Sequence, residues 1–308
     1  MINFRYHIVS LMAVFIALSV GIAVGVSLSP SVDQGIITQA AQDRKQVTDL
    51  RAELDRRNAL DEYRETYEQR VGRVATENLL SGIRVAVVAM PDAPSAVVQA
   101  ISTATEEAGG NVVRDVKINA EVFEASQADK INKSLAPWAP DINSGESMSP
   151  ATKLGLALAR SIAARGVLDR DSQALAIGDA LTSNGWATIS KGSAAQAQLV
   201  IVVTAEATDP RPTPEILAAH VQLDVALKTR AAVVLAGPNS EDLEGTDVLA
   251  ARSDATAVDE LSTVDVADLS SGVTTTVLAG REQLNGGSGQ HYGALAKADA
   301  PLPDLPVR

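Results

Sequence analysis

Few residues of this chain could carry out acid–base, nucleophilic or soft-metal chemistry. Its 308 residues include three histidines and no cysteine, which excludes disulfide scaffolds, thiolate metal sites and cysteine nucleophiles. His220 falls in the middle of a predicted helix and His291 in a Gly-rich segment, so a structural or solvated role explains each better than catalysis. We therefore expect no catalytic residue, no cofactor and no metal ligand, and we expect that the protein is not an enzyme.

Metal and phosphate sites are equally hard to find. The methionines at positions 1, 12, 90 and 148 lie far apart and away from any histidine, so the sequence contains no soft copper-binding cluster. Four carboxylates near predicted strand ends could bind a hard cation, although scattered acids are expected in a chain of net charge −12: Glu206, Asp209, Glu241 and Asp242. The loops after the predicted strands lack the glycines that a phosphate-binding loop needs.

The overall charge limits the class of partner. A net charge of −12 and an aromatic content of 3% argue against nucleic-acid binding, which needs basic patches and stacking surfaces. We expect protein partners and a lipid bilayer.

Residues 8–28 are uncharged and mostly apolar, which predicts a transmembrane helix within an anchor of residues 1–30. A cleaved signal peptide is the alternative, but its apolar region would be shorter. Arg5 precedes the segment and Asp33 is the first charge after it, so the positive-inside rule places the N-terminus in the cytoplasm. This predicts a single-pass protein of the cytoplasmic membrane with an extracytoplasmic C-terminal domain.

Small residues recur at every fourth position of the predicted span, at Ala13, Ala17, Gly21 and Gly25. This spacing aligns small side chains along one helix face and includes a G-x-x-x-G pair, which favours close helix–helix packing in membranes. The sequence therefore predicts that two copies pair through this face.

Residues 31–80 are predicted to form a coiled-coil stalk. Apolar residues follow 3/4 spacing in two runs, with a six-residue step between Leu54 and Leu60 where a heptad would need seven. The predicted seam, which would also bind a partner helix, consists of Val47, Leu50, Leu54, Leu60, Tyr63, Tyr67 and Val71. A solvated helix packed on its own globular domain is the alternative. Together with the small-residue face, the seam favours a parallel homodimer.

Residues 81–285 are predicted to form an α/β domain. Continuous apolar runs predict buried strands near residues 83–90, 111–118, 187–190, 198–204 and 231–236, with a last short strand near 261–266. Predicted helices alternate with them near 93–108, 149–165, 172–183, 212–230 and 270–284. This order indicates a Rossmann-like domain with a mainly parallel sheet. Residues 286–308 are Gly- and Pro-rich and are expected to form a flexible tail.

Two end motifs carry a family resemblance. The sequence FRYHIVSL at residues 4–11, which continues into the small-residue span, and the sequence LAGREQL at residues 278–284, followed by His291, Tyr292 and Gly293, resemble the signature of the actinobacterial MctB family. The order of anchor, stalk and α/β domain is also similar, so the resemblance covers nearly the whole chain.

The resemblance implies two alternative functions. The family is named for mycobacterial copper transport and includes members described as outer-membrane pores, which implies copper efflux. Corynebacterial members called SteB imply a scaffold in cell division that binds a membrane partner of the SteA type and regulates a peptidoglycan hydrolase through a coiled coil of the RipA type. Because the predicted strands suit a soluble core rather than a lipid-facing barrel, the sequence favours the scaffold over the pore.

Overall fold

The structure is a computed structural model that describes residues 4–190, 192–240, 244–295 and 297–305, without the side chains of residues 4–6 and 28–41. The chain divides into two compact units, Met1–Arg64 and Glu65–Arg308. We call the first the helical unit and the second the α/β unit. Helix α1, Phe4–Thr76, contains the whole described part of the helical unit and contributes its last turns to the α/β unit.

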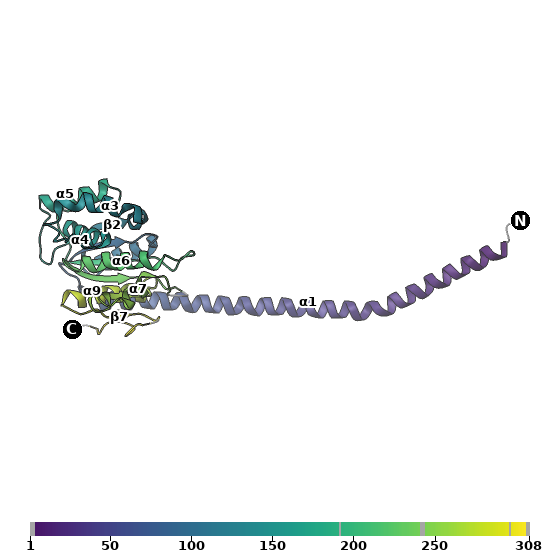
Figure 1. The fold of residues 1–308 in the computed structure, drawn as a ribbon. Helices are drawn as coiled ribbons and strands as arrows, with labels where there is room; N and C mark the ends of the chain where they lie inside the picture. The colour runs from purple at the N-terminus through teal and green to yellow at the C-terminus, as the bar shows by residue number, and fades with distance from the viewer. Residues whose placement is uncertain (1–3, 191, 241–243, 296, 306–308) are drawn as a thin grey trace. The chain divides into compact units, whose positions relative to one another are not determined.

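The α/β unit combines one seven-stranded sheet with helices on both faces (Figure 1). Its strands are β1 Arg84–Ala89, β2 Asn111–Ile118, β3 Ala187–Ser190, β4 Leu199–Val203, β5 Ala232–Ala236, β6 Ser262–Val264 and β7 His291–Tyr292. The helices are α2 Ser95–Glu107, α3 Ala128–Leu135, α4 Pro150–Ile162, α5 Ser172–Ser183, α6 Pro214–Leu227, α7 Asp247–Ser253, α8 Ala257–Glu260 and α9 Ser270–Leu284. Three short 3₁₀ segments, η1 Ala120–Phe123, η2 Ala125–Gln127 and η3 Ala136–Trp138, flank α3.

The strand order across the sheet is β3-β2-β1-β4-β5-β6-β7. Every pair is parallel except β2 with β3, which is antiparallel. The predicted α/β class and mainly parallel sheet are therefore confirmed. The strand near residues 261–266 is not the last one, because β7 follows it and pairs with β6 through the registers Thr263 to His291 and Val264 to Tyr292.

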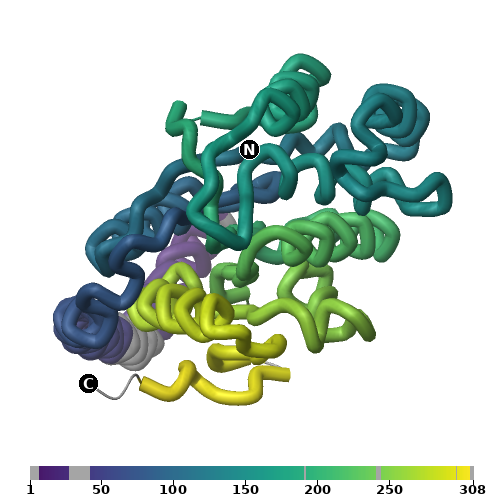
Figure 2. Tube along the Cα trace, turned by 90° about the vertical axis from the view of Figure 1, so that its left-hand side faces the viewer, coloured from purple at the N-terminus to yellow at the C-terminus, as the bar shows by residue number. Residues whose placement is uncertain are grey.

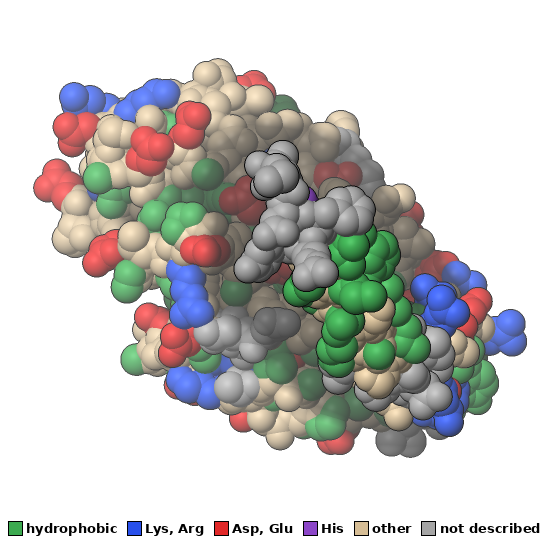
Figure 3. Space-filling view, turned by 90° about the vertical axis from the view of Figure 1, so that its right-hand side faces the viewer, with side chains coloured by type: hydrophobic (Ala, Val, Ile, Leu, Met, Phe, Trp, Pro, Cys, Tyr) green, Lys and Arg blue, Asp and Glu red, His purple; other side chains and the backbone are tan. Residues whose placement is uncertain are grey.

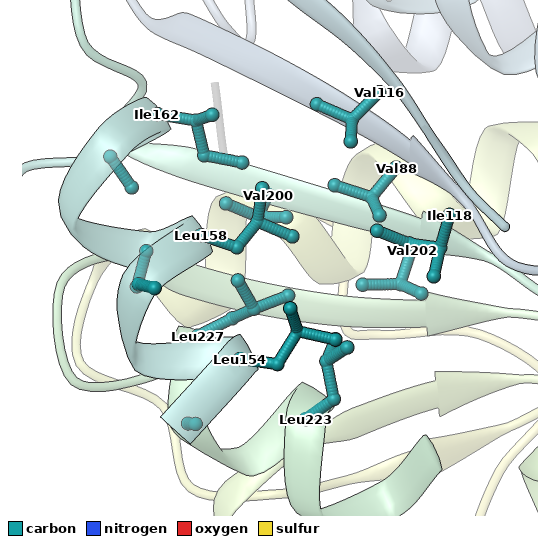
Figure 4. Packing of buried hydrophobic residues seen from close by; sticks show 14 of the residues in the cluster. Val88, Val116, Ile118, Leu154, Leu158, Ile162, Val200, Val202, Leu223 and Leu227 are labelled. Atoms are coloured by element: carbon teal, nitrogen blue, oxygen red, sulfur yellow. The ribbon is translucent and has the colours of Figure 1, made fainter. Parts of the chain in front are cut away.

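Both faces of the sheet are buried, as the continuous apolar runs require. On one face, Val88, Val200 and Val202 pack beneath Leu154 and Leu158 of α4, and α6 completes this layer (Figure 4). On the opposite face, α2 and α9 cover the strand side chains that point the other way. These are Val85, Val87, Ile201, Val203 and Val234. Figure 1 shows α3, α4 and α5 on one side of the unit and α9 with β7 on the other.

The last turns of α1 are part of the α/β unit and lie along α9 (Figure 2). The carboxylate of Glu68 accepts the backbone N–H of Ser271 at 3.1 Å, and Arg73 forms an ion pair of 2.9 Å with Glu107 of α2. A methyl group at Gly72 would approach the hydroxyl oxygen of Thr274 to 2.2 Å, so a larger residue at this position would clash with α9. The alternative of a helix packed on its own domain therefore applies to the end of α1.

Candidate functional site

The predicted membrane span lies in the helical unit. Residues His7–Ser27 of α1 form one helix that is long and apolar enough to cross a membrane. Hydrophobic side chains make up most of the surface of this segment (Figure 3). Arg5, on which the predicted orientation rests, lies outside the described side chains.

The four small residues of the span all lie on this exposed helix. A methyl group at Gly21 or Gly25 would meet no atom within 4 Å, so the surface at both glycines is open. Fourfold spacing of small residues, which also includes Ala13 and Ala17, suits close approach of a second helix. Pairing of two copies stays a prediction.

The predicted seam residues are all exposed on α1, with exposed fractions between 42% and 67%: Val47, Leu50, Leu54, Leu60, Tyr63, Tyr67 and Val71. The structure does not place them on a single face. Because α1 is one continuous α-helix, the six residues from Leu54 to Leu60 turn by about 600°, which is about 120° short of two full turns. The apolar residues therefore form two stripes, one from Val47 to Leu54 and one from Leu60 to Val71.

A cleft of about 240 Å³ opens at the carboxyl ends of the central strands of the α/β unit. From β1 the chain continues to β2, toward one edge of the sheet, whereas from β4 it continues to β5, toward the opposite edge. Strands β1 and β4 therefore flank a topological switch point, which is the position where α/β folds bind ligands. We call this cavity the switch-point cleft. The segments that line it follow β1, β2 and β4 and begin α6 and α7; their residues are Pro91, Asp92, Ala120, Phe123, Glu124, Ala205, Glu206, Thr208, Pro210, Pro212, Ile216, His220, Gly245, Thr246 and Asp247.

A histidine–carboxylate pair lies in this cleft. The Nδ1 atom of His220, on α6, lies 2.8 Å from the Oδ1 atom of Asp247, the first residue of α7. The ring of Phe123 meets the imidazole edge-on, with 4.2 Å between ring centroids. Thr213 and Thr246 cap the two helices by accepting the N–H groups of Ile216 and Leu249, which fixes where the helices begin. His220 and Asp247 are only 6% and 5% exposed.

The hydrogen bond to Asp247 occupies Nδ1 of His220, which leaves Nε2 as the second ring nitrogen. Nε2 has no hydrogen-bond partner among the described residues, and it is also absent from the atoms there that are both buried and unsatisfied. It is therefore at least partly accessible, and His220 is one of the residues that line the cleft.

A second buried acid lies one helical turn beyond His220. Asp224 is fully buried, and neither of its carboxylate oxygens has a hydrogen-bond partner in the described part of the chain. Burial raises the pKa of Asp224 well above its usual range, and the nearby charge of Asp247 raises the same pKa further. The raised pKa of Asp224 favours the protonated, uncharged form of this carboxyl beside the histidine pair.

His291 has a structural environment. It is 5% exposed, and its Nδ1 atom lies 3.1 Å from the hydroxyl of Thr263. The same hydroxyl accepts the Nε–H of Arg252 at 2.8 Å, and Arg252 also donates to Asp265 at 2.7 Å and to the backbone oxygen of Tyr292 at 2.9 Å. Burial lowers the pKa of His291, and the charge of Arg252 lowers the same pKa further. The expectation of a structural role fits this environment, and we call Arg252, Thr263, Asp265, His291 and Tyr292 the C-terminal clamp.

The clamp explains the glycine of the C-terminal motif. Gly293 has φ of 136°, and a methyl group there would lie 1.9 Å from a carboxylate oxygen of Asp265. The carboxylate accepts the backbone N–H groups of Ala294 and Leu295 instead. Only glycine combines this backbone conformation with so close a neighbour.

No preformed metal cluster accompanies these residues. The described ranges contain no group of three or more histidine, aspartate or glutamate side chains placed to hold a metal ion. Of the acids that the sequence suggested for a hard cation, Glu206 lines the switch-point cleft, whereas Glu241 and Asp242 lie outside the described residues. Sequence reasoning missed Asp247 and Phe123 as neighbours of His220. The available signal was the spacing of His220 and Asp224, two polar residues four positions apart that lie on the buried face of α6.

Comparison with known proteins agrees with the resemblance of the two end motifs. The sequence model of the family described as "Copper transport outer membrane protein, MctB" matches residues 1–303. Proteins named "Copper transporter MctB" from Mycobacterium bovis and Mycobacterium tuberculosis are 28% identical to this chain over 307 residues, which cover 95% of this chain and 96% of theirs. The Mycobacterium leprae protein of the same name is 26% identical over 309 residues, with the same coverage. With its apolar N-terminal helix, this membrane-associated chain belongs to the MctB family.

Proposed function

We propose that this chain is a membrane-anchored protein of copper transport in the cell envelope. The observation that carries the proposal is the family match across residues 1–303, together with relatives over 95% of the chain that are named copper transporters. We propose that the protein acts without catalytic turnover and that copper is its cargo.

The single span limits how such a protein could work. One helix encloses no channel, so conduction would need several spans around a common axis. The open surface at Gly21 and Gly25 supports close packing of spans. We propose the cytoplasmic membrane as its location, with the N-terminus in the cytoplasm and the α/β unit outside. The outer membrane is the alternative that the family description suggests.

The test is copper content in cells that lack the gene. Deletion in the source bacterium should raise cell-associated copper and lower the copper concentration that stops growth, and the wild-type gene should reverse both effects. Zinc content serves as the control and should not change. Unchanged copper content in the deletion strain would refute this function.

A second candidate function is a scaffold of cell division, and the exposed apolar stripes of α1 favour it. Leu50 and Leu54 are 61% and 56% exposed, and a helix gains stability when a partner covers such residues. In this alternative, the stalk forms a coiled-coil homodimer, binds a membrane partner of the SteA type, and controls a peptidoglycan hydrolase through a coiled coil of the RipA type. The α/β unit would then be a Rossmann-like domain held away from the bilayer.

Leu54→Asp tests the scaffold directly. The charge should abolish co-purification of envelope partners and crosslinking between copies along the stalk, and copper content should stay normal. Asp55→Ala, one position further along the same helix, is the control and should retain both contacts. Co-purification unchanged by Leu54→Asp would refute the scaffold.

A further inference from the structure

We propose that the switch-point cleft binds an organic cation, a primary ammonium group on a short apolar chain, and that Asp247 and His220 recognise it. A lysine side chain of a protein partner and a free alkylamine share this chemistry. Such a site goes beyond the proposed copper transport and does not depend on it. Neither the family description nor the names of the relatives assigns it.

The charge of the cleft favours a cation. Four of the described residues that line it are acidic, and none of them is a lysine or an arginine; the acids are Asp92, Glu124, Glu206 and Asp247. A cleft lined by one sign of charge concentrates ions of the opposite sign. Because the net charge of −12 makes exposed acids common on this chain, the deeper groups must provide the evidence for a specific site.

Two deeply buried side chains in the cleft each retain one polar atom for a ligand. His220 and Asp247 are 6% and 5% exposed, and both line the cleft. Their mutual hydrogen bond at 2.8 Å uses Nδ1 of the ring and Oδ1 of the carboxylate. The other two atoms, Nε2 and Oδ2, have no hydrogen-bond partner in the described part of the chain, and neither is closed off from solvent. A ligand in the cleft can therefore reach both atoms.

A primary ammonium group matches these two atoms. It has three N–H donors and no acceptor, so it needs acceptors on the protein. Oδ2 of Asp247 can accept one N–H in a charge-assisted hydrogen bond, and Nε2 of His220 can accept a second when the ring proton is on Nδ1.

The size and the walls of the cleft suit a short apolar chain behind the ammonium group. The volume of about 240 Å³ is that of about eight water molecules, which leaves room for a chain of about four carbons. Phe123 and Ile216 are partly buried and line the cleft, so the methylene groups of such a chain would be removed from water against them. The lysine side chain has this composition.

The experiment measures ligand binding to the full chain in detergent by equilibrium dialysis. Butylamine tests a free amine, and Nα-acetyl-lysine amide tests the same group as a protein presents it. Saturable binding of both would support a lysine side chain as the ligand, and binding of butylamine alone would support a free amine. Nα-acetylnorleucine amide, which has a similar side chain without the charge, should not bind. No saturable binding of either amine, or equal binding of the norleucine compound, would overturn the site.

Two variants locate the binding in the cleft. Asp247→Asn keeps the size of the side chain and removes its charge, so it should weaken amine binding by about tenfold or more. Glu206→Lys should fold normally because Glu206 is exposed, and its ammonium group should compete with the ligand and weaken binding by about fivefold or more. Asp259→Lys makes the same change of charge on α8, outside the cleft lining, and should bind like wild type. Wild-type affinity in Glu206→Lys, or in folded Asp247→Asn, would overturn the site.

Discussion

Replacing Asp265 with alanine should lower the unfolding free energy of the α/β unit by about 3–5 kcal/mol, because it removes a buried carboxylate that pairs with the buried guanidinium of Arg252. The side chains of Arg252 and Asp265 are both fully buried, and they meet at 2.7 Å. In the variant, the guanidinium of Arg252 would retain Thr263 and the Tyr292 oxygen as acceptors, but both are neutral. Strand β7 would also lose the carboxylate that accepts the N–H groups following it.

Heat unfolding of the full chain in detergent provides the measurement. Both tryptophans of the sequence, Trp138 and Trp186, belong to the α/β unit, so their fluorescence reports on that unit alone. For a unit of this size, 1 kcal/mol corresponds to a shift of about 2–4 °C, so Asp265→Ala should lower the midpoint by roughly 6–20 °C.

Two further variants make the test decisive. Asp259→Ala removes an exposed carboxylate from α8 and should change stability by less than about 0.5 kcal/mol. The double variant Arg252→Met with Asp265→Leu removes both charges and should recover part of the loss. A loss below about 1 kcal/mol in Asp265→Ala, or a double variant less stable than the single one, would refute the reasoning.

Three other predictions follow from the buried acid, a close helix crossing and the membrane span. Burial raises the pKa of Asp224 above its ordinary 3.8, so the folded state holds the proton more tightly than the unfolded state. Unfolding free energy should therefore fall by up to about 1.4 kcal/mol per pH unit as pH rises from 3.8 toward the raised pKa. Urea titrations at several pH values should show this slope, with Asp224→Asn removing it, and equal slopes in both proteins would contradict the assignment. Gly155→Ala should cost about 1–3 kcal/mol, because a methyl group would lie 2.5 Å from the Leu223 oxygen where α4 crosses α6. Gly145→Ala, which has open space, should be neutral, and equal midpoints in heat unfolding would contradict the crossing. Gly21→Ile should abolish crosslinking between spans in detergent without changing the fluorescence midpoint, whereas retained crosslinking would exclude this face as the contact.

The sequence predicted those parts of the fold whose signal is local. The run at residues 198–204 is apolar at nearly every position and predicts a doubly buried strand, and β4 occupies Leu199–Val203. The same reasoning did not predict α7, which has seven residues, or β7, which has two. The tail was expected to be flexible, but β7 lies within it: Arg252 donates to the backbone oxygen of Tyr292, and Thr263 contacts the side chain of His291. Such contacts leave no periodicity in the sequence.

The candidate site was less predictable for the same reason. His220 and Asp247 are 27 positions apart on different helices, and only the fold brings them to one cleft. The apolar residues of the stalk were recognised from their spacing. Because α1 is one continuous helix, the six-residue step between Leu54 and Leu60 moves the apolar stripe to another face of the helix.

The two outer edges of the sheet affect how copies of this protein can meet. One edge is the four-residue strand β3, which runs against its neighbour, and the other is the two-residue strand β7. Strands this short present few unpaired backbone groups to an incoming chain, which protects a sheet against growth into aggregates. Even when many copies are crowded together, growth of a continuous intermolecular sheet is therefore disfavoured, which leaves helices and loops as the surfaces for contact.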